Sequence, residues 1–293
     1  MTTLTNKNQI VRIHFLENEK KTELIENGIL NKDLDILSIA RYKESNKWNM
    51  EILVNKDFEQ VELNKVLMDT IGYIPKINIK NIENIDWVSE SLKNLKPLSV
   101  DRFYIYNSYY MNINKPEKIN IKIDASNAFG SGHHYSTIGC LESMSFLNKF
   151  KKFKNILDIG TGTGILIIAA AKLWKSRCLA TDIDPIANDI SINNIKINNT
   201  SIFTRVLQAK PLNYQMIRSK GQFDLIIINI LANSINKIVN DVNILTKRNS
   251  YVILSGIKKS QQAKVITKWN KFNFIPLKIF SYGNWVTLIL IKN

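Results

Sequence analysis

The chain contains little cysteine and no long hydrophobic run. Cys140 and Cys178 are its only cysteines among 293 residues, too few for a disulfide framework or a cysteine metal cluster. We expect both to be buried thiols in a reducing compartment. No run approaches the roughly 18 to 20 apolar residues of a membrane-spanning helix, so no membrane contact is expected. The first residues, MTTLTNKNQI, lack the apolar core of a secretion signal, which favours a cytoplasmic location.

Basic residues outnumber acidic residues in this chain. Lys and Arg number 40 against 25 Asp and Glu, which gives a net charge of +15. Such an excess is common among proteins that bind nucleic acid. The basic residues are scattered, however, with only short pairs such as Lys151-Lys152, and lysine, asparagine and isoleucine are abundant throughout. Two interpretations stay open: compositional bias on a solvated surface, or a preference for an acidic or ribonucleoprotein partner.

Residues 1–83 have a periodic pattern of their own. It predicts strands at residues 10–15, 34–41, 48–54 and 76–82, and helices at residues 17–29 and 57–71. The first helix is expected to end near Gly28, and Asp57 is expected to cap the second. The order β-α-β-β-α-β is that of a small ferredoxin-like α+β domain. Because no catalytic constellation is visible in it, we expect a docking module.

A linker at residues 84–99, expected to be helical, precedes a second domain over residues 100–293. From Asn155 onward strands and helices alternate, which predicts a doubly wound α/β fold with a parallel sheet. The last two strands flank the short turn Tyr282-Gly-Asn284 and must therefore be antiparallel. The expected strands are 100–106, 118–123, 155–159, 177–182, 201–207, 223–229, 250–255, 272–280 and 285–291, and the expected helices are 164–174, 185–195, 232–245 and 259–270.

A glycine-rich turn follows the first strand of the alternating region. The run Asn155-Ile-Leu-Asp-Ile-Gly-Thr-Gly-Thr-Gly164 places Asp158 before the glycines Gly160 and Gly162. Glycines allow the backbone to turn sharply and to approach a ligand closely. Asp182 ends the next strand, where a carboxylate can accept hydrogen bonds from ribose hydroxyls. This pattern predicts a nucleoside cofactor site.

Three features favour S-adenosylmethionine over a nicotinamide dinucleotide. Asp158 would repel a pyrophosphate, whereas its carboxylate suits the ammonium group of a methionine moiety. The terminal antiparallel hairpin is typical of methyltransferase sheets. The strand 223–229 ends in Asn229 at the sheet edge where ligands bind, although an asparagine there could also simply cap the following helix.

The run Ala128-Phe-Gly-Ser-Gly-His-His-Tyr-Ser-Thr137 resembles the signature of the bacterial ribosomal protein L-eleven methyltransferases. The glycine turn, Asp182-Ile-Asp-Pro185, Asn229-Ile-Leu-Ala232 and Leu254-Ser-Gly-Ile257 follow in the order of that family. The resemblance covers residues 119–293 most strongly. It implies a Rossmann-like class I methyltransferase sheet with a terminal antiparallel hairpin, preceded by a small substrate-recognition domain.

The resemblance also implies roles for individual residues. Thr137, Gly160, Asp182 and Asn229 match positions that bind S-adenosylmethionine, and Asn229 would orient the incoming amine. Phe129, Gly130, Gly132 and His134 belong to a loop that resembles a lid over the cofactor. The chain departs from the family at Asp124-Ala-Ser-Asn127, where Asp-Pro-Gly is usual, and this departure affects the entry of the loop.

The activity implied is methyl transfer to lysine side chains and the amino terminus of a large-subunit ribosomal protein, free or in the assembling ribosome. We expect a monomer without a metal, because His133 and His134 have no further histidine or cysteine nearby. Three other interpretations stay open: an RNA or DNA methyltransferase, a nicotinamide-dependent oxidoreductase, and a non-catalytic relative that binds the ribosome. Against the first, Asn229-Ile-Leu-Ala replaces the Asn-Pro-Pro-Tyr common in enzymes that methylate bases.

Overall fold

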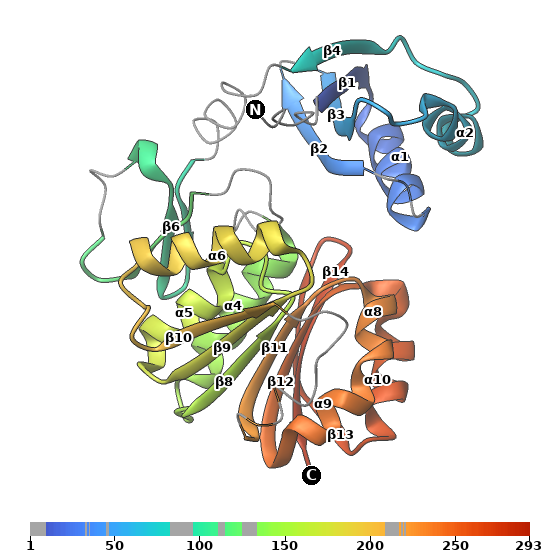
Figure 1. Ribbon diagram of the computed structural model, residues 1–293. Helices are drawn as coiled ribbons and strands as arrows, with labels where there is room; N and C mark the ends of the chain where they lie inside the picture. Colours follow the sequence, from blue (N-terminus) through green and yellow to red (C-terminus); the bar gives the residue numbers. More distant parts are fainter. Residues whose placement is uncertain are drawn as a thin grey trace, which may run out of the picture. The chain divides into compact units, whose positions relative to one another are not determined.

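The structure is a computed structural model that describes residues 10–32, 34, 36–44, 47–82, 96–110, 115–124, 134–208, 217, 219 and 221–293. The chain divides into two compact units, Met1–Ser91 and Leu92–Asn293 (Figure 1). The expected helix between residues 84 and 96 lies almost entirely outside the described residues. The assignment of residues 84–99 as a linker therefore stays a prediction.

The first unit is a four-stranded antiparallel sheet with two helices. Its sheet order is β2-β3-β1-β4, and its apolar core lies between one face of the sheet and the helices. Alternation sends Ile13 and Phe15 of β1, and Met50 and Ile52 of β3, to that face. The elements are β1 (Ile10–Glu17), α1 (Glu19–Asn31), β2 (Ile36–Glu44), β3 (Lys47–Asn55), α2 (Gln60–Ile71) and β4 (Asn78–Ile82), in the predicted order.

Both helix limits expected in this unit were wrong. Helix α1 continues through Gly28 to Asn31. Gly28 faces α2, and a Cβ atom at position 28 would lie 2.5 Å from Thr70 Cγ2. That glycine permits close helix packing and does not end the helix. Helix α2 begins at Gln60, after Glu59, whose side chain makes no capping hydrogen bond, so Asp57 is not its N-cap.

The second unit is built on a seven-stranded sheet of order β10-β9-β8-β11-β12-β14-β13. All neighbours from β10 to β12 are parallel, and β14 is antiparallel to both β12 and β13. The elements are β5 (Leu98–Val100), β6 (Phe103–Tyr106), β7 (Ile119–Lys122), α4 (Tyr135–Leu147), β8 (Asn155–Ile159), α5 (Ile165–Trp174), β9 (Arg177–Asp182), α6 (Pro185–Ile197), β10 (Thr204–Gln208), β11 (Phe223–Asn229), α8 (Ala232–Lys237), α9 (Val239–Leu245), β12 (Thr246–Lys258), α10 (Gln262–Asn270), β13 (Phe274–Tyr282) and β14 (Trp285–Lys292). The predicted doubly wound sheet with a terminal antiparallel hairpin is confirmed.

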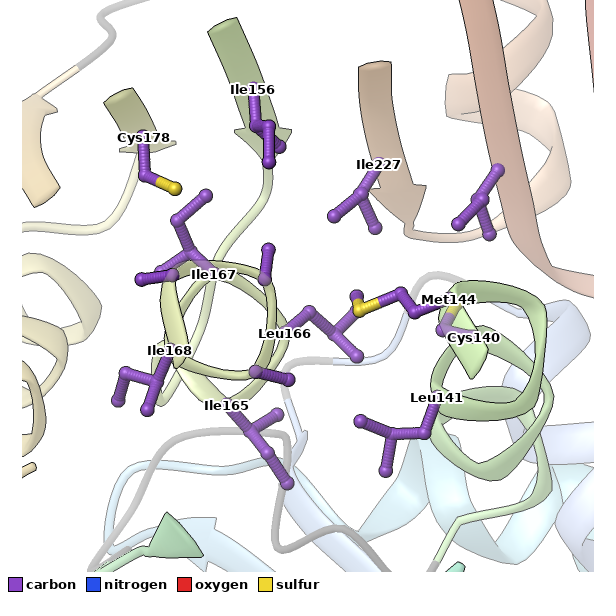
Figure 2. Close-up of a cluster of buried hydrophobic side chains, with 14 of the residues drawn as sticks. Cys140, Leu141, Met144, Ile156, Ile165, Leu166, Ile167, Ile168, Cys178 and Ile227 are labelled. Carbon is purple, nitrogen blue, oxygen red and sulfur yellow. The ribbon is translucent and has the colours of Figure 1, made fainter. Parts of the chain in front are cut away.

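Two apolar cores lie on opposite faces of this sheet. Central strands alternate between them: Leu225 and Ile227 of β11 belong to one core, and Ile226 and Ile228 to the other. The first core is formed with α4 and α5 (Figure 2), and the second with α8, α9 and α10. Both cysteines are buried in the first core, and burial raises the pKa of each thiol.

Several expected elements differ in this unit; the strand expected at residues 250–255, for example, extends over Thr246–Lys258. The strand expected at residues 100–106 is two antiparallel strands, because the chain turns at Asp101, whose φ is +41°. These strands and β7 form a separate three-stranded sheet. The helix expected at residues 232–245 breaks at Ile238, whose ψ is 0°, into α8 and α9. The strand expected to begin at residue 201 begins at Thr204, after a turn.

Candidate active site

The glycine turn joins the end of β8 to the beginning of α5. Gly160 adopts φ +74°, and a Cβ atom there would lie 2.5 Å from Ile230 Cγ2. Any other residue would therefore be strained and would also collide with the loop that follows β11. Gly160 thus allows the turn that follows β8 to lie against Ile230, which follows the neighbouring parallel strand β11.

Asp182 ends β9 beside this turn. One of its carboxylate oxygens accepts a hydrogen bond from the backbone N–H of Gly162 at 2.9 Å, and the other accepts from that of Asp184 at 3.1 Å. The second predicted feature, an acid at the end of the next strand, therefore lies against the glycine turn. Its contact with ribose hydroxyls stays a prediction.

Asp158 lies beneath the turn and is only 1% exposed. Its Oδ2 atom accepts a hydrogen bond from Thr161 Oγ1 at 2.7 Å, whereas its Oδ1 atom is buried without a partner among the described residues. Burial raises the pKa of this carboxyl to about 7; the Thr161 hydrogen bond opposes the rise, and the nearby Asp182 carboxylate adds to it. A buried acceptor of this kind has the chemistry to receive a donor from a ligand.

Asn229 and Thr137 meet at the same sheet edge, although 92 positions separate them. The Nδ2 atom of Asn229, at the end of β11, donates to Oγ1 of Thr137 in the first turn of α4 at 3.4 Å. Asn229 Oδ1 is buried and has no partner in the described part of the chain. The structure therefore brings these two predicted residues into contact and leaves a second acceptor free at the edge.

The first turn of α4 is tied to the sheet by hydroxyl groups that the sequence did not indicate. Ser255 Oγ of β12 donates to the carbonyl of Ser136 at 2.9 Å and lies 2.7 Å from Oγ1 of Thr287 on β14. His134, expected only as part of the signature loop, is the N-cap of α4, and its side chain accepts from Ser136 N. Burial lowers the pKa of that imidazole.

Phe129 and Gly130, predicted to contact the cofactor, lie outside the described residues, as does Gly132. Gly162 lies in the turn, where its N–H is bound by Asp182. Among the described residues, no group of three or more His, Cys, Asp or Glu side chains could hold a metal ion. None of the described helices is long and apolar enough to cross a membrane.

The family model of Ribosomal protein L11 methyltransferase (PrmA) matches residues 6–293, which include both units. The chain belongs to the ribosomal protein L11 methyltransferase family. Relatives of that name from Rhizobium meliloti and Rhizobium rhizogenes are 34% and 32% identical; the first match covers 89% of this chain and 90% of the relative, the second 96% and 98%. The crystal structure of a ribosomal protein L11 methylase from Lactobacillus delbrueckii subsp. bulgaricus has a TM-score of 0.59 and 25% identity, and the match covers 68% of this chain and all of that one.

Membership of the ribosomal protein L11 methyltransferase family explains why the expected motifs converge. The glycine turn, Asp182 and Asn229 lie at the carboxyl ends of β8, β9 and β11, which are neighbours in the sheet. Ser255 belongs to the motif Leu254-Ser-Gly-Ile257, but the sequence did not predict its contact with α4, because that contact depends on the position of Ser255 opposite Asn229 in the ladder between β11 and β12.

Proposed function

We propose that this chain is an S-adenosylmethionine-dependent protein methyltransferase that acts on ribosomal protein L11. It transfers methyl groups to amino groups, at lysine side chains and at the amino terminus. The observation that carries the proposal is the family match over residues 6–293, which spans the methyltransferase sheet and the small unit together. Relatives named for the same activity, at 32 to 34% identity over most of the chain, support it.

The residues at the sheet edge suit S-adenosylmethionine. Asp158 Oδ1 and Asn229 Oδ1 are buried acceptors without a donor among the described residues. The buried carboxylate of Asp158 matches a cationic ammonium group, and the amide oxygen of Asn229 matches an amine. Unpaired buried acceptors are costly, so a ligand that supplies donors at this edge would be stabilised.

In this mechanism, residues of the chain bind the cofactor and orient the acceptor amine. S-adenosylmethionine supplies an electrophilic methyl group on a sulfonium centre. Asp182 would accept hydrogen bonds from the ribose hydroxyls, Thr137 would contact the methionine end, and Gly160 would allow close approach of the backbone. Asn229 would orient the nitrogen of the acceptor toward the methyl group.

The acceptor amine must be unprotonated to attack. A lysine amine has an ordinary pKa of about 10.4, and removal from water favours its neutral form. Removal of the amine from water at the sheet edge would therefore lower its pKa, and its proton would be released to solvent before transfer. Asn229 then accepts a hydrogen bond from the neutral amine and leaves its lone pair free.

The small ferredoxin-like unit docks the substrate. It has an apolar core of its own and supplies none of the predicted cofactor-binding residues. Ribosomal protein L11 would be bound as the free protein or in the assembling ribosome, by a monomeric enzyme in the cytoplasm.

The test uses the purified chain, radiolabelled S-adenosylmethionine, and separated ribosomal proteins and RNAs from the same cells. Label should appear on L11 alone and should be resistant to nuclease. Label on RNA would instead identify a nucleic-acid methyltransferase. Absence of label from every fraction, with the cofactor still bound, would identify a non-catalytic relative.

A further inference from the structure

Asn194, a buried residue of α6, binds two separate parts of the site through its side-chain amide. Its Nδ2 atom donates to the carbonyl of Thr163, inside the glycine turn, at 2.8 Å. Its Oδ1 atom accepts from the backbone N–H of Asp124 at 3.2 Å. The side chain is only 1% exposed; its hydrogen bond to Thr163 is buried, and that to Asp124 is partly buried.

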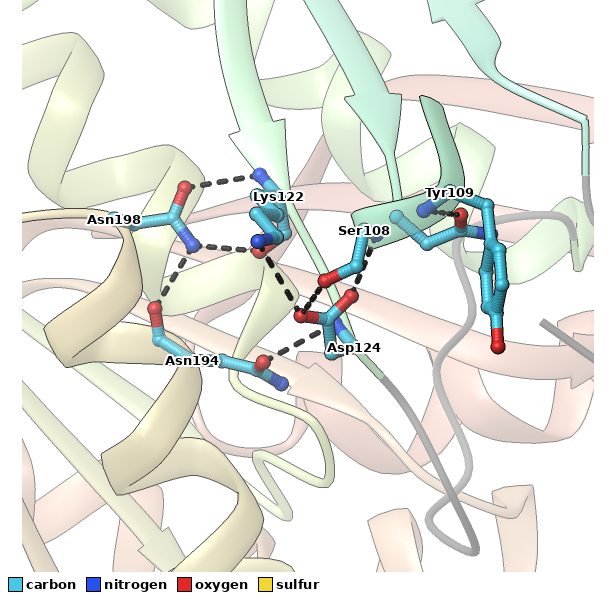
Figure 3. A network of polar contacts seen from close by, with 7 residues as sticks. Ser108, Tyr109, Lys122, Asp124, Asn194 and Asn198 are labelled. Atoms are coloured by element: carbon cyan, nitrogen blue, oxygen red, sulfur yellow. Dashed lines mark hydrogen bonds and ion pairs between the residues drawn. The ribbon is translucent and has the colours of Figure 1, made fainter. Parts of the chain in front are cut away.

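The second partner, Asp124, is itself firmly held. Its carboxylate accepts from the N–H and hydroxyl of Ser108 at 2.8 Å and 2.5 Å, and it lies 3.6 Å from Lys122 Nζ (Figure 3). Asp124 lies two residues beyond the end of β7, a strand of the small three-stranded sheet. The two hydrogen bonds of Asn194 therefore join the segment that follows β7 to the glycine turn that follows β8 of the large sheet.

Asn198, four residues further along at the C-cap of α6, provides a natural comparison. Its amide donates to Lys122 O at 2.6 Å and to Asn194 O at 2.8 Å, and accepts from Lys122 N at 3.0 Å. It is 6% exposed and thus equally buried. Figure 3 shows both asparagines projecting from the same helix toward the strand that ends near Asp124. Within the described part of the chain, the side chain of Asn194 donates to the glycine turn, whereas that of Asn198 contacts Lys122 and Asn194.

We propose that Asn194 is a positioning residue for S-adenosylmethionine, which holds the glycine turn at a fixed spacing from Asp124. It does not itself contact the cofactor; it sets the position of Thr163 and its neighbours. The inference rests on the proposed function, because it takes the glycine turn as the cofactor site. Helix α6 supports the adjoining acid in the same manner, since Asn188 Nδ2 donates to the carbonyl of Asp182 at 3.1 Å.

The experiment compares Asn194→Ala with Asn198→Ala in the full-length chain. Each variant removes a buried amide from α6, so both should lower the free energy of unfolding in urea. Calorimetry should find S-adenosylmethionine binding to Asn194→Ala about tenfold weaker, which corresponds to about 1.4 kcal/mol. Binding to Asn198→Ala should stay within about twofold of the unaltered chain. Asn194→Ser and Asn198→Ser provide a milder pair if an alanine variant fails to fold.

Hydrogen exchange without the cofactor supplies a readout that does not depend on binding. Amides of the glycine turn, residues 160–164, should exchange faster in Asn194→Ala and at the normal rate in Asn198→Ala. Equal affinity and equal exchange in the two variants would overturn the inference while leaving the proposed function intact. Failure of the unaltered chain to bind S-adenosylmethionine would overturn both.

Discussion

Gly256 lies against the backbone of Ile230, the residue that follows Asn229. A Cβ atom at position 256 would lie 2.1 Å from the carbonyl oxygen of Ile230, and Gly256 adopts φ +80°. The ladder between β12 and β14 shifts its register between Leu254 and Ile257, so Gly256 sits in a bulge. This bulge lets β12 lie against Ile230, in the loop that directly follows Asn229.

Gly256→Ala should therefore lower turnover at least tenfold, because the methyl group would displace the backbone beside Asn229. The obstacle is a main-chain atom, which cannot move as a side chain could. Gly221→Ala is the matched control: its φ is +89°, and nothing lies within 4 Å of a Cβ atom there. The control should lose only about 1 kcal/mol of stability and keep its turnover. Similar kinetics in the two variants would contradict the role given to Gly256.

Asp182→Ala and Asn229→Ala should separate binding from turnover. Asp182 holds Gly162 N–H in the glycine turn, so its loss should weaken S-adenosylmethionine binding at least tenfold. Asn229→Ala should instead reduce kcat and leave cofactor affinity within a few-fold. Calorimetry and steady-state kinetics measure the two effects. Unchanged affinity in Asp182→Ala would refute the ribose contact, and unchanged kcat in Asn229→Ala would refute its orienting role.

Asp158 should make stability depend on pH. Its pKa is raised from 3.8 to about 7 by burial, so the folded chain binds more protons than the unfolded chain between these values. The free energy of unfolding should therefore fall as pH rises from about 4 to about 7, by on the order of 4 kcal/mol from this group. Asp158→Asn should remove that fall, and urea denaturation across this range would measure it. An identical slope in the variant would contradict the prediction.

Ser255→Ala should loosen the attachment of α4 to the sheet. The substitution removes the hydrogen bond to Ser136 O and leaves the buried hydroxyl of Thr287 without this partner. We expect a loss of about 1–2 kcal/mol in the free energy of unfolding. Ser143→Ala is the comparison. The Ser143 hydroxyl donates only to Gly139 O of its own helix, so its removal should lower the free energy of unfolding by less. A larger loss in Ser143→Ala would exclude the proposed tie.

Removal of residues 1–95 should abolish methylation of ribosomal protein L11 and preserve cofactor binding. The apolar core of the small unit lies within residues 11–77, whereas both cores of the second unit lie beyond residue 97. The second unit should therefore fold without the first. Calorimetry with S-adenosylmethionine and a labelling assay with L11 would be compared on the truncated chain. Methylation at the normal rate would refute docking by the small unit.

Local patterns were sufficient wherever a feature depends on neighbours in sequence. The strands at 155–159, 177–182 and 223–229 were predicted with the limits that the structure has, because each is a short apolar run bounded by turn residues. The helix limits predicted near Gly28 and Asp57 were wrong. Gly28 lies inside α1 and permits close packing against α2, a tertiary contact that the local pattern does not show. Aspartate is a turn residue that tolerates positive φ, so Asp101 carried a turn signal that the prediction did not use, whereas Ile238 carried none.

Short segments of the chain were enough to predict the order of the elements, the glycine turn, the acid that ends β9 and the amide that ends β11. Each of these follows from hydrophobic period, glycine conformation or strand ends, which are properties of neighbouring residues. Long-range packing was needed to bring Asn229 to Thr137, to place Ser255 against α4, and to let Asn194 join Thr163 to Asp124. Those contacts join residues 31 to 119 positions apart. They depend on which strands become neighbours in the sheet, and no short segment contains that information.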